Sequence, residues 1–338
     1  MKTIKAVNIY FSLIILLVIS ISSCSDDVIT PDTRQPFEIR AWDYSDNHYF
    51  LDTIYKQSFE DFYNNVTISS HKDSLAVDEQ SFEVWVQTDV TTINYRFAGL
   101  HVDLQKLPSN GNYNETLKIV PITQQGVRTF GLVRKLSQSE YVLNKYAGYV
   151  SLKVDIANNF FAGVAYKRNR TGEQFGTIST DSGSLATDTL VLKMVRVQNL
   201  IPENTLAWEL KLKNIYQLPK SSISQNGFEF YIQYSTNPNL PGISDPLIQI
   251  LGLDRYNSGR TGTPDGKFDY IPGLTIDQSN GWIIFPSLEP FLTNFQNYNN
   301  NGQTIDPSYW YPEIYRNLKH QANLHPNANK YSLSGFAP

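Results

Sequence analysis

The sequence predicts a mainly β fold, made of antiparallel, β-sandwich-like units with a few short helices. Apolar and polar residues alternate with a period of two in several segments, most strictly in residues 149–156. This alternation is typical of a strand with one buried face. Aromatic residues make up 13% of the chain, and antiparallel sheets favour aromatic side chains. We identify helix signals in only two short stretches, so the fold class is mainly β.

The period-two segments are the expected strands. In residues 82–86, the side chains of Phe82, Val84 and Val86 share a face. In residues 149–156 the even positions are aliphatic and should face the core. The odd positions should face water, and they are Tyr149, Ser151, Lys153 and Asp155. Further strands are expected at residues 190–198, 206–214 and 228–234, and we expect these three to pair in one sheet.

Two neighbouring positions test this register. Leu210 lies on the expected core face of the strand at 206–214, so Leu210→Asp should unfold the domain. Lys211 lies on the opposite face, which should be solvated, so Lys211→Asp should be nearly silent.

The helix signals lie in the last third of the chain. Asp245 and Pro246 could start a helix of about two turns that ends at Gly252. Trp310, Ile314 and Leu318 are spaced four apart, which predicts a helix of about ten residues within 309–320, with Pro312 in its first turn. The polar, Asn-rich residues 294–301 are expected to form a loop.

The N-terminus has the pattern of an export signal. Lys2 and Lys5 precede an apolar run over residues 11–21, which is too short to span a bilayer as a helix. The run ends in Ile21-Ser22-Ser23-Cys24, which resembles the lipobox of a bacterial lipoprotein. Cys24 is the only cysteine of the chain. We therefore predict that Cys24 is lipidated and anchors the protein to the outer membrane.

The remaining chain divides into segments of different composition. Residues 1–23 are the expected signal peptide, and residues 24–36 lack any apolar period and read as a flexible tether. We place a β-rich domain at 37–183 and a second one at 184–338. The boundary falls where Ser, Gly, Asp and Thr interrupt the strands, in residues 180–187.

Composition and motifs exclude several classes of function. The chain has 28 Lys and Arg against 32 Asp and Glu, so it lacks the basic surface that nucleic-acid binding requires. With one cysteine it has no intrachain disulfide and no multi-cysteine metal site. No nucleotide-binding or hydrolase motif is present. We therefore predict a protein that is not an enzyme.

The histidines give no sign of a metal site. None belongs to a HExxH pattern, and the closest pair would lie on different faces of a helix. We expect surface positions for all five: His48, His71, His101, His320 and His325.

One glycine-rich stretch, residues 251–273, concentrates oxygen-bearing side chains. These are Asp254, Asn257, Asp265 and Asp269. Calcium prefers such ligands on a flexible backbone. The spacing does not fit an EF-hand, however, and Asp and Asn also cap tight turns. We favour the structural interpretation and keep calcium as the one possible cofactor.

Ten blocks of the sequence, in order, resemble the N-terminal repeated domain of the SprA (Sov) family of outer-membrane proteins in gliding motility and type 9 secretion. The similar region is residues 82–338. The blocks are FEVWVQT (82–88), LSQSEYVLNKYAGYVSL (136–152), FAGVAYK (161–167), LAWELKLKNIYQL (206–218), GFEFYIQY (227–234), LIQILGLDRYN (247–257), PDGKFDYIPGLTI (264–276), NGWIIFPSLEPF (280–291), YPEIY (311–315) and NKYSLSG (329–335).

The resemblance implies a role in protein secretion without a pore. The chain is shorter than the large barrel of that family requires, so the domain would act as an accessory or interaction component, with outer-membrane secretion or motility proteins as partners. Whether it faces the periplasm or the cell surface is left open.

A second function class is a surface glycan-binding lipoprotein. The 21 tyrosines, the 5 tryptophans and the many asparagines motivate it, because aromatic faces and amide edges suit sugars. Aromatic residues in strands also have a structural explanation, since they pack well in antiparallel sheets.

Overall fold

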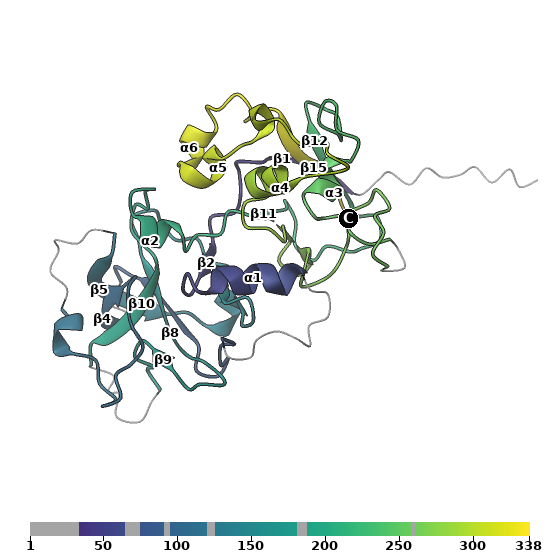
Figure 1. Ribbon diagram of the computed structural model, residues 1–338. Coiled ribbons are helices and arrows are strands. Elements are labelled where there is room, and N and C mark those ends of the chain that lie inside the picture. Colours follow the sequence, from purple (N-terminus) through teal and green to yellow (C-terminus); the bar gives the residue numbers. More distant parts are fainter. Residues whose placement is uncertain (1–33, 65–74, 91–94, 120–125, 181–187, 258–260) are drawn as a thin grey trace, which may run out of the picture. The chain divides into compact units, whose positions relative to one another are not determined.

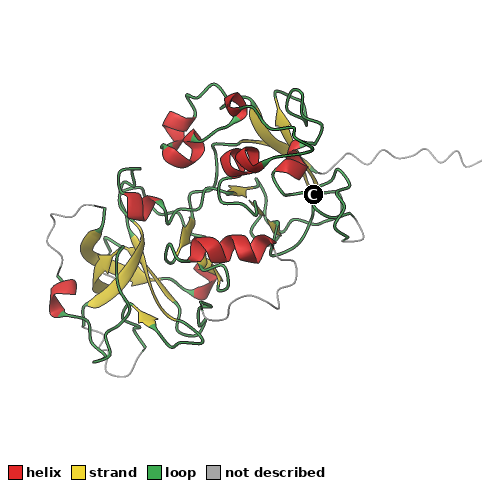
Figure 2. Cartoon of the chain, in the orientation of Figure 1, coloured by secondary structure: helices red, strands yellow, loops and turns green. Residues whose placement is uncertain are grey.

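The computed structural model describes residues 34–64, 75–90, 95–119, 126–180, 188–257 and 261–338. Most of its regular structure is strand, and the helices are short and separated by long connecting segments (Figures 1 and 2). The prediction of a mainly β fold with antiparallel sheets and a few short helices is confirmed.

The largest sheet has the strand order β10-β4-β5-β3-β8-β9. Its strands are β3 (Glu83–Gln87), β4 (Tyr95–His101), β5 (Arg128–Lys135), β8 (Ala162–Lys167), β9 (Gln174–Phe175) and β10 (Leu190–Arg196). All pairings are antiparallel except that between β4 and β10. Because β10 also pairs with β8, the strand order closes on itself. The ring of β10, β4, β5, β3 and β8 has no free edge, and β9 pairs with β8 outside it.

Three smaller sheets contain the other strands. One has the order β2-β7-β6, from β2 (His48–Phe50), β6 (Tyr141–Asn144) and β7 (Tyr149–Leu152). Another has the order β11-β14-β13, from β11 (Ile215–Gln217), β13 (Ile276–Asp277) and β14 (Trp282–Ile284). The last has the order β1-β15-β12, from β1 (Gln35–Arg40), β12 (Glu229–Tyr234) and β15 (Tyr331–Ala337). In this sheet the last strand of the chain lies between the first strand and β12.

The helices are α1 (Tyr55–Asn64), α2 (Thr205–Trp208), α3 (Leu247–Ile250), α4 (Phe295–Asn297), α5 (Glu313–Arg316) and α6 (Lys319–Ala322). Single 3₁₀ turns are η2 (Glu115–Leu117), η3 (Gln138–Glu140) and η5 (Pro307–Tyr309), and η4 (Pro290–Asn294) is a π-helical turn. The longest helix, α1, buries Tyr55, Phe59, Phe62 and Tyr63 on one side, which is helical spacing.

The buried apolar residues form two large clusters. The first cluster contains β2, β3, β7, β8 and most of β10, and also Leu274, Trp282 and Ile284 from later in the chain. The second cluster contains β12, β15, α3 and α5, together with Phe37, Ala41 and Tyr44 from the start of the described chain. Residues Arg34–Pro338 belong to one unit. The predicted boundary at 183/184 lies within residues 181–187, outside the described residues.

The predicted strand at 228–234 is confirmed as β12, with Phe230, Ile232 and Tyr234 buried and Tyr231 48% exposed. The strand predicted at 206–214 is wrong, because its first residues form α2 and Lys211 makes only an isolated bridge with Tyr49. The predicted common sheet is therefore also wrong. β10 pairs with β4 and β8, whereas β12 pairs with β15.

The predicted water-facing side of residues 149–156 is also wrong for its strand residues. All four residues of β7 are buried, because β7 is the central strand of its sheet and both of its faces are covered. The hydroxyl groups of the odd positions are paired internally. Ser151 Oγ lies 2.7 Å from His48 Nδ1, and Tyr149 Oη lies 2.8 Å from Tyr63 Oη.

The helix predictions hold only in part. The segment after Asp245 is helical at α3, with Pro246 rather than Asp245 as the N-cap residue. The single helix predicted within 309–320 is wrong, because Asn317 and Leu318 are extended and separate α5 from α6. The loop predicted at 294–301 contains the helical turn α4.

The close packing of β15 against β12 gives a testable prediction at Gly335. A Cβ atom at this position would lie 1.9 Å from the backbone oxygen of Glu229 on β12, so the strands must separate to admit it. We expect Gly335→Ala to lower the free energy of unfolding by about 3 kcal/mol in urea titrations. Gly262→Ala is the control, because no atom lies within 4 Å of its Cβ, and it should change stability by less than about 0.5 kcal/mol. Equal stability of the two variants would contradict this packing.

Candidate functional site

The predicted lipidation residue, Cys24, the signal peptide and most of the tether lie outside the described residues. Among the residues that are described, no helix is both long and apolar enough to cross a membrane. The lipid anchor therefore stays a prediction from the sequence.

The side chains of the 251–273 stretch cap turns. The Asp254 carboxylate is 1% exposed and accepts hydrogen bonds of 3.0 Å from the backbone N–H groups of Asp265 and Gly266. Asp265 accepts one from the backbone of Lys267 at 3.1 Å. Asp269 accepts one from the backbone of Arg255 at 2.6 Å. The carboxylates that calcium would need are thus turned toward backbone donors.

Asn257 has the same kind of role. Its amide group bonds the hydroxyl groups of Thr261 and Thr263, and its Oδ1 accepts the backbone N–H of Thr261. Within the described ranges, no group of three or more His, Cys, Asp or Glu side chains is arranged to hold a metal ion. These hydrogen bonds agree with the structural interpretation of the stretch.

The prediction of surface positions for the histidines is wrong for two of them. His48 is fully buried, with its ring edge-on to Trp282 at 4.8 Å between centroids, and burial lowers the pKa of His48 to about 3. His101 is 2% exposed and its Nε2 lies 2.8 Å from the Leu117 oxygen. His320 is exposed, as expected, and His325 is half-buried beside Glu313. His71 lies outside the described residues.

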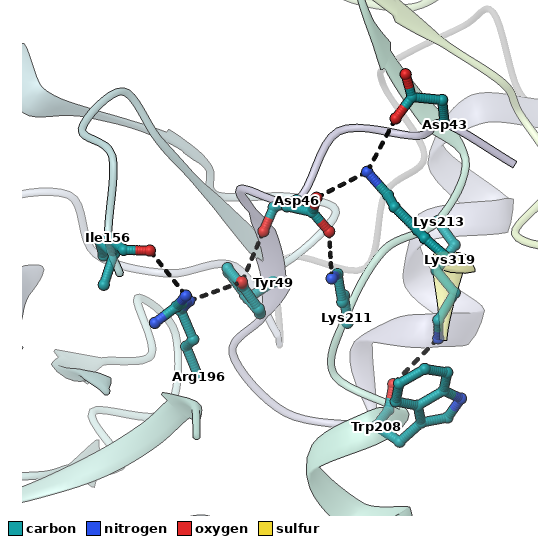
Figure 3. A network of polar contacts seen from close by, with 9 residues as sticks. All are labelled: Asp43, Asp46, Tyr49, Ile156, Arg196, Trp208, Lys211, Lys213 and Lys319. Carbon is teal, nitrogen blue, oxygen red and sulfur yellow. Dashed lines mark hydrogen bonds and ion pairs between the residues drawn. The ribbon is translucent and has the colours of Figure 1, made fainter. Parts of the chain in front are cut away.

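A network of charges surrounds Asp46, in the segment between β1 and β2 (Figure 3). Its carboxylate pairs with Lys211, which follows α2, and with Lys319 of α6 at 2.7 Å. Lys319 also lies 3.3 Å from Asp43. Burial alone would raise the pKa of Asp46, but the charges of Lys211 and Lys319 outweigh it and hold the pKa below its usual value. Asp46 thus joins three segments that are distant in the sequence.

The network continues into the first cluster through Tyr49 and Arg196. The Tyr49 hydroxyl donates to the Asp46 carbonyl oxygen at 2.6 Å and accepts from Arg196 Nε at 3.1 Å. The Arg196 guanidinium also donates to the carbonyl oxygens of Ile156, Ala157 and Phe160. Arg196 is therefore held in place by four oxygen atoms, and it fixes the 156–160 turn against β10.

A cavity of about 450 Å³ borders this network. Its lining includes the aromatic residues Tyr44 and Trp208 and the charged residues Asp46, Arg196, Lys211 and Lys319. The ammonium groups of Lys211 and Lys319 lie 5.4 and 4.7 Å from the centroid of the Tyr44 ring. Most of the charges in this cavity are already paired with one another, so its polar groups stabilise the fold rather than being available to a ligand.

Lys213 is a second buried cation near this network. It is 7% exposed, donates to the Trp208 carbonyl oxygen at 3.3 Å, and lies 4.2 Å from the Trp208 ring centroid. Within the described part of the chain, no carboxylate lies within ion-pair distance of its ammonium group. Burial, followed by the charge of Lys211, lowers the pKa of Lys213 to about 7.

Another cavity, of about 460 Å³, is lined mainly by polar side chains. It lies between the end of α1, the α3 segment and the η4–α4 turns, and we call it the amide cavity. Five side-chain amides line it: Asn64, Gln249, Asn294, Asn297 and Asn299. Ligand pockets are usually lined mostly by apolar side chains, so any ligand of this cavity would have to be polar.

Sequence reasoning missed the functional features of this region. The three segments that line the amide cavity are far apart in the chain, and the Asn-rich residues 294–301 were expected to form a loop. The helix α1 did carry a signal, because Tyr55, Phe59, Phe62 and Tyr63 have helical spacing. The roles of Asp46 and Arg196 had no motif that could identify them.

The contacts of Lys211 contradict the prediction that Lys211→Asp is nearly silent. Its side chain is 14% exposed and pairs with Asp46, so Lys211→Asp would place a second carboxylate beside Asp46. We expect a loss of about 2 kcal/mol in the free energy of unfolding, measured by urea titration. The control is Lys153→Asp, at an exposed residue, which makes the same change of charge. If both variants are equally stable, the Asp46 network contributes nothing to the fold.

The pKa of Lys213 predicts a pH-dependent stability. The folded protein loses this proton near pH 7, whereas an unfolded lysine keeps it to about pH 10. The unfolded state binds more protons above pH 7, so stability should rise with pH from 7 to 9. Lys213→Met should reduce this rise by about 1 kcal/mol per pH unit in urea titrations. Lys153→Met should retain the rise of stability with pH. The same rise in Lys213→Met would contradict the assignment of this pH dependence to Lys213.

No protein-family model matches the chain, and no curated protein is significantly similar to it. The resemblance of the ten blocks to the SprA family therefore remains a prediction from the sequence. What the protein does has to be proposed from the blocks and from the geometry described above.

Proposed function

We propose that the protein is a lipid-anchored, non-enzymatic component of the outer membrane that interacts with the machinery of type 9 secretion or gliding motility. The proposal rests on the resemblance of residues 82–338 to the SprA N-terminal domain and on the lipobox at Cys24. Its partners would be outer-membrane secretion or motility proteins, and its own contact with the membrane would be the lipid.

The observation that carries the proposal is the way the resembling blocks pack together. The block at 227–234 contains β12, and the block at 329–335 contains most of β15; these strands pair from Glu229↔Phe336 to Tyr234↔Tyr331. The blocks at 247–257, 280–291 and 311–315 supply buried residues to the same cluster. Blocks that contribute to one core are what a shared domain requires.

The blocks in the first half are arranged in the same way. The blocks at 82–88 and 161–167 contain β3 and β8, which pair between Glu83↔Ala165 and Val86↔Ala162 in the closed sheet. The block at 136–152 contains β6 and β7, which pair with each other. The resemblance thus follows the strand pairings in both clusters, which supports a domain of the same kind.

A deletion strain of the source bacterium tests this function. We expect deletion of the gene to reduce the amount of type 9 cargo proteins in the culture medium, measured by quantitative mass spectrometry. Wild-type protein expressed in the deletion strain should restore secretion. The tagged protein should also co-purify with the secretion channel from solubilised outer membranes.

Two point variants separate the anchor from the fold. Cys24→Ala removes the only thiol and should release the protein from the membrane fraction, so it should fail to restore secretion. Ser25→Ala is the control, because it leaves the thiol in place. Normal secretion in the deletion strain would refute the proposed function, and membrane retention of Cys24→Ala would refute the anchor.

A second candidate function is binding of glycans at the cell surface, and the amide cavity favours it. Amide groups can donate and accept hydrogen bonds at once, which matches the hydroxyl groups of a sugar. This candidate does not depend on the SprA resemblance, and the two functions can be tested separately.

A further inference from the structure

We propose that the amide cavity is a binding site for a neutral carbohydrate, with room for one or two sugar units. This inference rests on the second candidate function, glycan binding, and assigns it to a defined place. The volume of the amide cavity, about 460 Å³, lies within the range of small-molecule sites. What distinguishes it is the chemistry of its lining.

The cavity offers polar groups that no neighbouring residue uses. The side chains of Gln249, Thr293 and Asn297 line it, and none of them hydrogen-bonds another residue of the described ranges. Together they present carbonyl acceptors, amide donors and a hydroxyl that can do both. A sugar carries adjacent hydroxyl groups that also donate and accept. A ligand of this type can satisfy all three side chains at once.

Other lining residues are already fixed, so the site is partly preorganised. Asn294 donates to the Ile250 carbonyl oxygen at 3.0 Å, which leaves its Oδ1 available. The Tyr298 hydroxyl donates to Asp245 at 3.0 Å, so the ring is held at the cavity wall. Rigid polar and aromatic groups bind with a smaller loss of entropy than mobile ones.

Charge argues for a neutral ligand. Glu60 and Asp245 line the cavity together with a single cation, Arg255. The two carboxylates would repel an anion, whereas a carboxylate accepts hydrogen bonds from neutral hydroxyl groups readily. Arg255 Nη2 donates to Asn64 Oδ1 at 2.9 Å, so the one cation of the lining is held against the cavity wall. In the cavity beside Asp46, by contrast, cationic side chains outnumber carboxylates, because Arg196, Lys211 and Lys319 line it.

Neighbouring residues of α4 supply a matched pair of variants. Asn297 lines the cavity, whereas Gln296 does not, and both are exposed amides in the same helical turn. A substitution at either position should leave the core unchanged. Any difference in binding between Asn297→Ala and Gln296→Ala therefore reports on the cavity.

The experiment uses the purified full chain in detergent and an array of malto-, cello-, xylo- and manno-oligosaccharides, with heparin as an anionic comparison. The neutral oligosaccharide that binds is then titrated by calorimetry. We expect Asn297→Ala to raise its Kd by about three- to tenfold, and Gln249→Ala with Asn297→Ala by about thirtyfold. Gln296→Ala should match the wild type, and thermal unfolding should show that all variants are folded.

The possible outcomes separate the site from the function. Binding of a neutral oligosaccharide that is weakened only by the cavity variants supports the proposal. Binding that survives both cavity substitutions would overturn this site while leaving glycan binding in place. Binding of heparin alone, or of no oligosaccharide in the array, would overturn the site as a neutral-sugar site.

Discussion

The fold depends on the pairing of β15, at the C-terminus, with β1, the first strand of the described residues. β15 lies between β1 and β12, in register from Gln35↔Ala337 to Arg40↔Ser332 on one side. The second cluster therefore needs residues from both ends of the described chain, and it cannot close until almost all of the chain has been placed. Such long-range pairing carries a loop-closure cost and slows folding. The benefit is that β15 is covered on both edges, and only β1 and β12 are left as edge strands.

The same N-terminal segment leads from the second cluster into the first. Tyr44 belongs to the second cluster and Tyr49 to the first, and Asp46 lies between them with its carboxylate on Lys211 and Lys319 (Figure 3). Exposed ion pairs add little stability, and the Asp46 side chain is 54% exposed. Its contribution is better understood as specificity. A carboxylate that must meet two lysines from distant segments accepts one arrangement of the two clusters and penalises the others.

The sequence predicted the positions of several strands, including β3, β7, β10 and β12. It predicted the exposure of side chains poorly where both faces of a strand are covered. In β12 the alternation is real, because Tyr231 is exposed and its neighbours are buried. In β7 both faces are covered, so alternation in the sequence did not mean exposure. The error at 206–214 has a different cause. Lys211 and Lys213 looked solvated, but one pairs with Asp46 and the other lies over Trp208. A buried lysine with a specific partner cannot be distinguished from a surface lysine by its spacing alone.

The two candidate sites, the 251–273 stretch and the amide cavity, also differ in how far the sequence could predict them. The acidic stretch 251–273 was visible in the sequence because its residues are consecutive, and its turn-capping role follows from short-range hydrogen bonds. The amide cavity was invisible, because its lining comes from α1, the α3 segment and the η4–α4 turns. Polar composition cannot separate a solvated loop from the wall of a polar site, since both need side chains without internal partners. In the folded chain, Asn297 and Gln249 have no side-chain hydrogen bond to another described residue, and both line the same cavity. The proposal of a ligand site rests on this shared position, which spacing in the sequence could not reveal.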